Sequence, residues 1–184
     1  MSIDVLNNKF ASLDEDKQQK VLEYVSLLAL QQAKDRAEST FWEFIDKIDY
    51  DGETAEDMLS PLIEALAASS IKTIYNFQDR LSERLAALDG PTYHAIASKG
   101  LSGSSDSFLY ARCFVVANGR DLYYQVINNP TKFPDEWFED ILNVPGKAYE
   151  KKVGTPLDRM SSEVYESFFN QELWGDKAIN LYAL

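Results

Sequence analysis

The stretch IKTIYNFQDRLSERLAAL, residues 71–88, carries the clearest helical pattern in the 184-residue chain. Charged side chains occupy one face of the helix it predicts, and the turn-forming sequence Asp89-Gly90-Pro91 follows at once. The apolar side chains recur at every third or fourth position, as on the buried face of an amphipathic α-helix: Ile71, Ile74, Phe77, Leu81, Leu85 and Leu88.

Helix-start signals recur on both sides of this stretch. Ser12 with Glu15, and Thr40 with Glu43, have the spacing of a capping box, in which two side chains satisfy free N–H groups at a helix start. The first of these helices is expected to end at about Ala37. Further helices are expected to begin near Thr54, Tyr93, Asp106, Leu122, Pro134 and Ser162, with a break at Val144-Pro145-Gly146.

Sustained alternation of apolar and polar residues, the pattern of a half-buried strand, is absent from the sequence. The segment Phe114–Val116 is β-branched and aromatic enough for a buried strand. It lies, however, between a helix cap at Asp106 and a helix-ending Gly119, so we expect a helix there. The prediction is an all-α fold, a compact multi-helix domain of about eight helices with an N-terminal helical extension.

A domain boundary is predicted where the long N-terminal helix gives way to the cap at Thr40. Residues 1–39 are expected to form an amphipathic helical extension, with apolar residues such as Val21, Val25 and Leu28 at spacings of four and three. Residues 40–184 are expected to form the helical domain.

The charge of the chain excludes some partners and permits others. The 30 acidic and 18 basic residues give a net charge of −12, spread along the whole length. This charge repels phosphate backbones and no Lys/Arg cluster opposes it, so nucleic-acid binding is not expected, whereas a basic protein partner is permitted. The N-terminal sequence has no signal-peptide pattern and no apolar stretch approaches about 18 residues, so we expect no membrane contact and a cytoplasmic location.

Residues that support common catalytic and metal sites are scarce. His94 is the single histidine and Cys113 the single cysteine, and neither has a partner nearby in sequence for nucleophilic catalysis. The acidic run Asp46–Asp57 does not fit a calcium loop, because Lys47 and Met58 would occupy ligand positions. We therefore expect no catalytic residue, no metal site and no cofactor.

Arg112 lies among residues that favour burial, in the run FLYARCFVV, residues 108–116. A buried guanidinium needs a partner, because an unpaired buried charge costs several kcal/mol. One interpretation is an internal ion pair with a carboxylate, either Asp106 or the more distant Asp46. The alternative is a ligand-binding arginine at the bottom of a cleft.

Two motifs resemble the bacterial family called domain of unknown function 4240, from Thr40 to about Asp135. The family's Phe-Trp-x-x-Ile-Asp element is matched by Phe41–Asp46, and its Ser-Asp-Asp-x-Phe-x-x-Phe-Arg-x-Trp-Leu-Ile-x-x-Gly element by residues 104–119, SSDSFLYARCFVVANG. Asp106 and Arg112 fall in register, whereas Ser105 replaces an acid, which argues against an acid-based active site. The resemblance implies a helical domain without established activity, among relatives similar to accessory or immunity-type proteins.

The function we predict from the sequence is a non-enzymatic, immunity- or antitoxin-like interaction protein that binds a basic protein partner. The alternative is a metal-independent hydrolase or small-anion-binding protein centred on Asp106 and Arg112, with Trp42 beside them. A homodimer built through the N-terminal helix is a third hypothesis. The candidate binding residues are Trp42, Asp46, Asp106 and Arg112.

Overall fold

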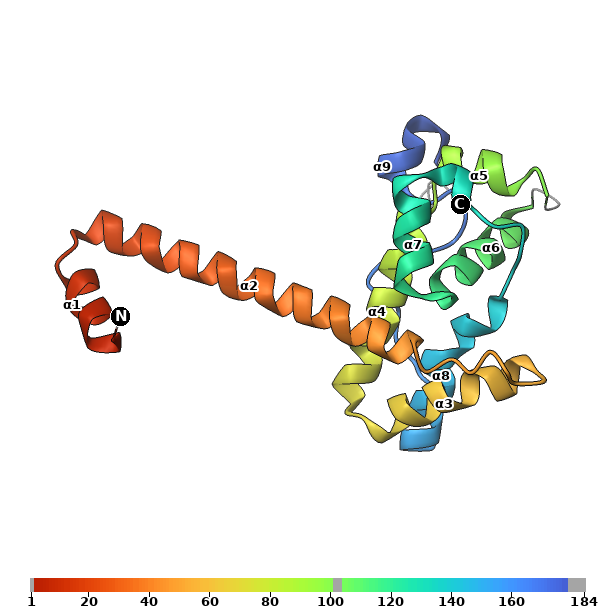
Figure 1. The fold of residues 1–184 in the computed structure, drawn as a ribbon, viewed down its shortest axis with the longest axis horizontal. Helices are drawn as coiled ribbons and strands as arrows, with labels where there is room; N and C mark the ends of the chain where they lie inside the picture. The colour runs from red at the N-terminus through yellow and green to blue at the C-terminus, as the bar shows by residue number, and fades with distance from the viewer. Residues whose placement is uncertain (1, 101–103, 179–184) are drawn as a thin grey trace. The chain divides into compact units, whose positions relative to one another are not determined.

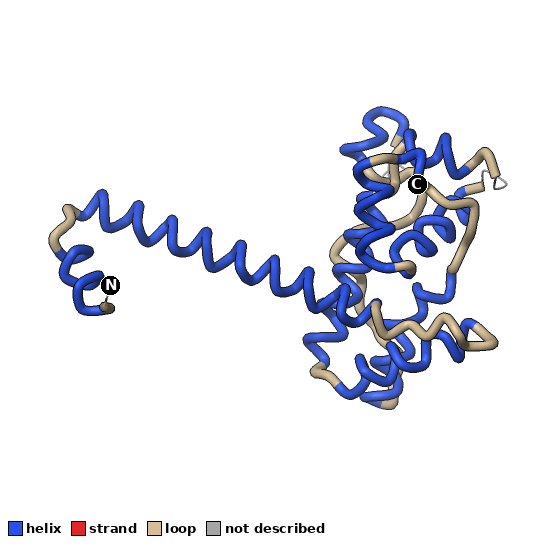
Figure 2. The backbone as a smooth tube through the Cα atoms, in the orientation of Figure 1, coloured by secondary structure: helices blue, strands red, loops and turns tan. Residues whose placement is uncertain are grey.

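The computed structural model describes residues 2–100 and 104–178, and in these ranges every regular element is helical (Figures 1 and 2). The predicted all-α fold is therefore confirmed. The segment Phe114–Val116, whose composition also suits a buried strand, lies inside a helix as expected. The α-helices are α1 Ile3–Ala11, α2 Glu15–Ile45, α3 Ala55–Ala68, α4 Ile71–Ala87, α5 Pro91–Ala97, α6 Ser105–Ala117, α7 Gly119–Asn128, α8 Val144–Val153 and α9 Gln171–Trp174. Three short 3-10 helices are η1 Pro130–Lys132, η2 Glu139–Asn143 and η3 Gly175–Lys177.

The chain divides into two compact units, Met1–Thr40 and Phe41–Leu184. Helix α2 supplies most of the first unit, and its last turn contributes the buried residues Phe41, Trp42 and Ile45 to the second. None of the described helices is both long enough and apolar enough to span a bilayer.

The start of α2 differs from the predicted capping box. Ser12 ends α1 instead, where its hydroxyl donates to the carbonyl of Lys9 at 2.7 Å. The cap of α2 is Asp14, whose Oδ1 accepts from the Lys17 N–H at 3.0 Å. The sequence prediction was wrong by two residues because both Ser12 and Asp14 are good caps, and the short helix α1 already uses the first.

The expected helix break at Thr40 is also wrong, because α2 continues to Ile45. No proline or glycine lies between Ala37 and Ile45, so nothing in the backbone chemistry forces the helix to stop there. The capping-box spacing of Thr40 and Glu43 occurs within a helix that is already formed.

Helix α4, predicted over 71–88, lies at the centre of the second unit. It contacts α3, α6 and α8, and α3 lies along α8 (Figure 1). Ile74, Phe77 and Leu85 are almost completely buried, as the spacing predicts. The capping box of α3 is present, with Thr54 and Asp57 bonded to each other's backbone N–H.

The chain after α7 departs from the predicted helices in two places. Residues 134–136 form no regular helix, and α8 begins at Val144, where a break was expected. Pro145 occupies the first turn of α8, a position at which a proline costs no helical hydrogen bond.

The predicted helix from Ser162 is absent, and residues 154–170 run over the second unit without regular structure. Their apolar side chains pack against the core, with Tyr165 and Phe168 partly buried. Phe168 has a positive φ of 74°, which no helix allows. Polar contacts to α4 and α6, described below, hold this C-terminal segment in place.

Candidate functional site

The four residues predicted from the sequence do not gather into one open site. Trp42 is buried in an aromatic cluster, 4.9 Å from the Phe41 ring and 5.3 Å from the Tyr123 ring. Asp46 and Asp106 are exposed, whereas Arg112 is completely buried. Because Trp42 and Arg112 are both buried, neither side chain opens onto a cleft shared with Asp106.

Arg112 binds protein groups with all three of its nitrogen atoms. Nη1 donates to the carbonyl of Leu85 at 2.9 Å, Nη2 to the hydroxyl of Ser167 at 2.9 Å, and Nε to the carbonyl of Phe108 at 3.4 Å. The guanidinium also lies 4.7 Å from the centre of the Phe108 ring. Burial lowers the pKa of Arg112 to about 10, and the negative charge of Asp89 opposes that shift.

The expectation that a carboxylate binds Arg112 directly is therefore wrong, because its hydrogen-bond partners among the described residues are two carbonyls and one hydroxyl. The carbonyl of Leu85 lies in the last turn of α4, where the partial negative charge of a helix end favours a cation. Neither Asp106 nor Asp46 is bonded to the guanidinium. Carbonyl and hydroxyl groups together satisfy it, which sequence spacing could not indicate.

Asp89 is the most heavily bonded side chain that the sequence analysis missed. It is completely buried, directly after α4, and its two oxygens accept four hydrogen bonds. Oδ1 accepts from Phe168 N at 2.9 Å and from Trp174 Nε1 at 3.1 Å, and Oδ2 accepts from Phe169 N and Asn170 N, each at 2.9 Å. In the sequence it looks like an ordinary turn residue before Gly90-Pro91, so no local signal marks its burial.

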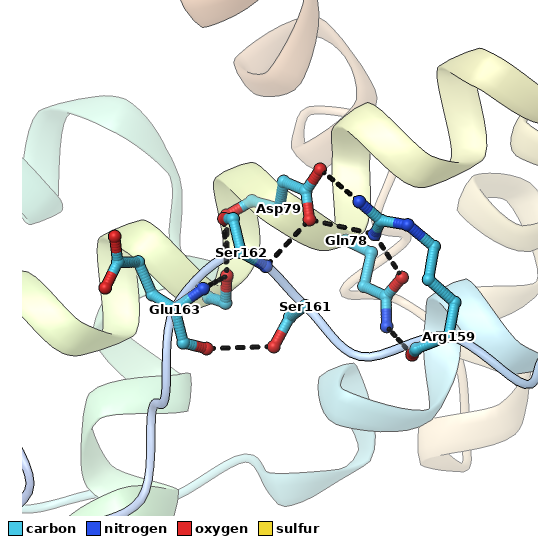
Figure 3. A network of polar contacts seen from close by, with 7 residues as sticks. Gln78, Asp79, Arg159, Ser161, Ser162 and Glu163 are labelled. Carbon is cyan, nitrogen blue, oxygen red and sulfur yellow. Dashed lines mark hydrogen bonds and ion pairs between the residues drawn. The ribbon is translucent and has the colours of Figure 1, made fainter.

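A second polar contact between α4 and the C-terminal segment centres on Asp79 (Figure 3). Arg159 donates to both oxygens of Asp79, at 2.8 and 2.6 Å, and also to Gln78 Oε1 at 2.8 Å. The N–H of Ser162 donates to Asp79 Oδ1 at 2.9 Å. Together with Asp89 and Arg112, this network fixes residues 159–174 on the second unit, which is a structural task.

Cys113 and His94 have surroundings that suit packing. Cys113 is completely buried, and burial raises the pKa of its thiol to about 12, so the reactive thiolate is strongly disfavoured. His94 packs edge-on against Phe108 and Phe168, at 5.1 and 5.2 Å between ring centres. Within residues 2–100 and 104–178, no cluster of three His, Cys, Asp or Glu side chains is placed to hold a metal ion.

The most distinctive exposed feature of the second unit is the stretch Asp46–Asp57, which comprises the connection between α2 and α3 and the first three residues of α3, and which we call the acidic turn. Its six carboxylates are all exposed, and Lys47 is the one basic residue among them. The carboxylates are Asp46, Asp49, Asp51, Glu53, Glu56 and Asp57.

Backbone contacts give the acidic turn a defined conformation. The N–H of Asp49 donates to the carbonyl of Met58 at 2.9 Å, and the N–H of Gly52 donates to the carbonyl of Asp49 at 3.1 Å. A Cβ at Gly52 would lie 2.7 Å from Met58 N, so only glycine fits without a shift. The backbone that carries the carboxylates is therefore held in place by the fold around it.

Tyr50 lies in the middle of the acidic turn with half of its surface exposed. Its hydroxyl donates to the carbonyl of Ala117, which fixes the ring against the end of α6. Partial burial raises the pKa of Tyr50 to about 12, with a further contribution from the negative charge of Asp46. A cationic side chain can lie over the face of such a ring and pair with a neighbouring carboxylate at the same time.

An open groove of about 340 Å³ begins at Glu56 and runs between α3 and α8. Glu64 and Glu150 line it, together with Lys147 and Lys151. Lys151 is paired with Glu64 at 2.6 Å, so one acidic side chain of the groove is already neutralised. With three acidic and two basic side chains in its lining, the groove has a net charge of −1 and adjoins the acidic turn at Glu56.

Comparison with known proteins adds a family and no activity. No curated protein and no solved structure gives a significant match to this chain. The family described as "Protein of unknown function (DUF4240)" matches residues 37–151. The matched region includes the acidic turn, Asp89 and Arg112, whereas Ser167 and the rest of the C-terminal segment lie beyond it. Because the match covers more than half of the 184 residues, the chain belongs to the DUF4240 family.

Proposed function

We propose that this protein is a non-enzymatic interaction module that binds a basic protein partner through the acidic turn. The observation that carries the proposal is the combination of six exposed carboxylates with a fixed, half-exposed Tyr50. Preorganised aromatic residues commonly supply the binding energy of an interface, and surrounding charges accelerate encounter and select the partner.

The groove beside the acidic turn supports the same proposal. Its carboxylates at Glu56 and Glu150 would accept lysine or arginine side chains next to those bound at Tyr50. A partner with a basic loop or helix would bind at Tyr50 and in the groove with the same element. Neutralising a basic toxin in the cytoplasm, as an immunity- or antitoxin-like protein does, is the biological role that we propose.

The hydrolase or anion-binding alternative gains no support from the surroundings of Arg112. Its guanidinium is completely buried, and its nitrogens bind Leu85, Ser167 and Phe108. A small anion would have to displace these groups. Asp106 is exposed in the first turn of α6, where a carboxylate stabilises the helix.

The test is capture of a partner from the lysate of the source cell, at low and at high salt. The Debye length falls from about 10 Å at 0.1 M salt to about 3 Å at 1 M, so association with a basic partner should slow markedly. The captured protein should be basic. The product of an adjacent gene is the first candidate partner to test by co-expression with this chain.

Matched variants then assign the binding to the acidic turn. Asp51→Asn with Glu53→Gln removes two exposed charges from the turn, and Glu172→Gln with Asp176→Asn removes two exposed charges elsewhere. We expect the first pair to weaken binding several-fold more than the second, and Tyr50→Ala to weaken it further. Equal effects of the two pairs would show that only the net charge matters and would contradict a site at the turn.

A further inference from the structure

Helix α2 carries an exposed apolar run that lies entirely within residues 1–40. From Val21 to Leu30, eight of the ten residues are apolar, and Glu23 and Ser26 are the exceptions. All ten are exposed, and the large apolar side chains have exposed fractions between 39% and 64%. A helix segment this apolar is normally buried, and most helical stability in proteins comes from packing of an apolar face, so we expect another surface to cover this run.

The length of the apolar run argues against a bilayer as its environment. Ten helical residues extend about 15 Å, which is half of the roughly 30 Å hydrocarbon thickness. Lys17 and Lys20 precede the run, and Lys34 and Arg36 follow it. An apolar stretch of this length between charged ends is typical of a helix packed against protein.

One row of side chains along α2 has the spacing of a coiled-coil contact. The residues are separated by four, three, four, three and four positions, which keeps them on one side of a helix. We call this row the α2 stripe: Lys17, Val21, Tyr24, Leu28, Gln31 and Asp35.

The α2 stripe is complementary to itself in one direction only. Tyr24 and Leu28 lie equally far from its midpoint, as do Lys17 and Asp35 at its ends. An antiparallel second copy therefore places Tyr24 against Leu28 and Lys17 against Asp35 at both ends of the contact. A parallel copy in register places Lys17 against Lys17 and Asp35 against Asp35, which is unfavourable.

The end residues can form these contacts without losing their own. Lys17 is paired with Asp14 of the same helix at 2.6 Å, and an ammonium group has three donors. Asp35 accepts from Gln31 at 2.8 Å through Oδ1, and a carboxylate accepts several hydrogen bonds.

We propose that two copies of this chain pair antiparallel through the α2 stripe. The contact extends about 27 Å, from Lys17 to Asp35, at 1.5 Å per residue. Val25 and Leu27 flank the stripe, one on each side, and widen the buried surface. The dimer uses residues of the first unit only, so it is independent of the acidic turn and of its basic partner.

The first experiment is sedimentation equilibrium of the full-length protein over a wide concentration range. We expect a reversible monomer–dimer equilibrium. Leu28→Glu should raise the dimer dissociation constant by about tenfold or more, because it buries an unpaired charge in the contact. Leu30→Glu is the matched control. The exposed fraction of Leu30 is 61%, similar to the 52% of Leu28, but Leu30 lies on the opposite side of the helix because it is two residues further along.

A charge exchange tests the direction of the pairing. Lys17→Glu alone should weaken the dimer, because it faces Asp35 at both ends, and so should Asp35→Lys alone. The double variant should restore the original dissociation constant, since opposite charges meet again. In a parallel pair the double variant still places like charges together and restores nothing.

Three results would overturn the proposal. The first is a monomer at every concentration with helix content unchanged by circular dichroism, and the second is an equal response to Leu28→Glu and Leu30→Glu. The third is a monomer that sediments with vesicles of phosphatidylcholine and phosphatidylglycerol, which would assign the apolar run to a membrane surface.

Discussion

Replacing Asp89 by asparagine should destabilise the second unit strongly while changing its shape very little. Oδ1 accepts from Phe168 N and Trp174 Nε1, and Oδ2 accepts from Phe169 N and Asn170 N. The amide of asparagine keeps one oxygen acceptor and turns the other position into a donor. Two buried N–H groups would then face an NH₂ group.

The magnitude follows from the bonds that are lost. A hydrogen bond to a charged group contributes about 1.5–3 kcal/mol, and two are lost, so we expect a loss of about 3–6 kcal/mol in the free energy of unfolding. Asp89 also opposes the depression of the Arg112 pKa, so its neutralisation removes a favourable interaction with that cation. Exposed Glu172, in the same C-terminal region, supplies the control Glu172→Gln, which should change the stability by less than about 0.5 kcal/mol.

Urea unfolding followed by circular dichroism measures the loss, and limited proteolysis reports the attachment of residues 154–178. The fluorescence of Trp174 gives a local signal, because its indole N–H is bonded to Asp89. We expect earlier cleavage in the C-terminal segment of the Asp89→Asn variant than in the control. A change in stability below about 1 kcal/mol, with the segment still protected, would refute the role assigned to Asp89.

Three further predictions concern other parts of the second unit. The free energy of unfolding should fall by up to about 1.4 kcal/mol per pH unit between pH 9 and pH 12, because the Cys113 thiol ionises from about pH 9 in the unfolded chain and near pH 12 in the folded protein. Denaturation over this pH range should show a shallower decline for a Cys113→Ala variant than for the original protein. Gly52→Ala should cost about 1–3 kcal/mol, because the new Cβ meets Met58 N at 2.7 Å, and thermal unfolding would show the loss. Arg159→Lys should cost about 1 kcal/mol, since an ammonium group lacks the planar fork that makes two parallel hydrogen bonds to Asp79, and an unchanged melting temperature would contradict this.

Most of the helices were predictable because their signals act over three or four residues. The spacing within residues 71–88 gave α4 almost to the residue, and Thr54 with Asp57 gave the start of α3. The burial of Arg112 also followed from its immediate neighbours, which are nearly all apolar. The two family motifs are equally local, and they identified the family from short stretches of sequence.

The mistakes arose where two local signals compete or where a distant residue decides. Both Ser12 and Asp14 can cap a helix, and α1 determines which of them caps α2. Ser162 has the chemistry of a helix start, but its N–H donates to Asp79, a residue more than 80 positions away.

The sequence by itself determined that this chain is helical, where most helices lie, and that Arg112 needs internal partners. Only the tertiary structure decided which partners those are, and that Asp89 binds a segment about 80 residues further along the chain. It also showed which apolar residues remain exposed, as in the run from Val21 to Leu30. The physical reason is that helix formation depends on neighbours within one turn, whereas a buried charge is satisfied by whatever group the folded chain brings next to it.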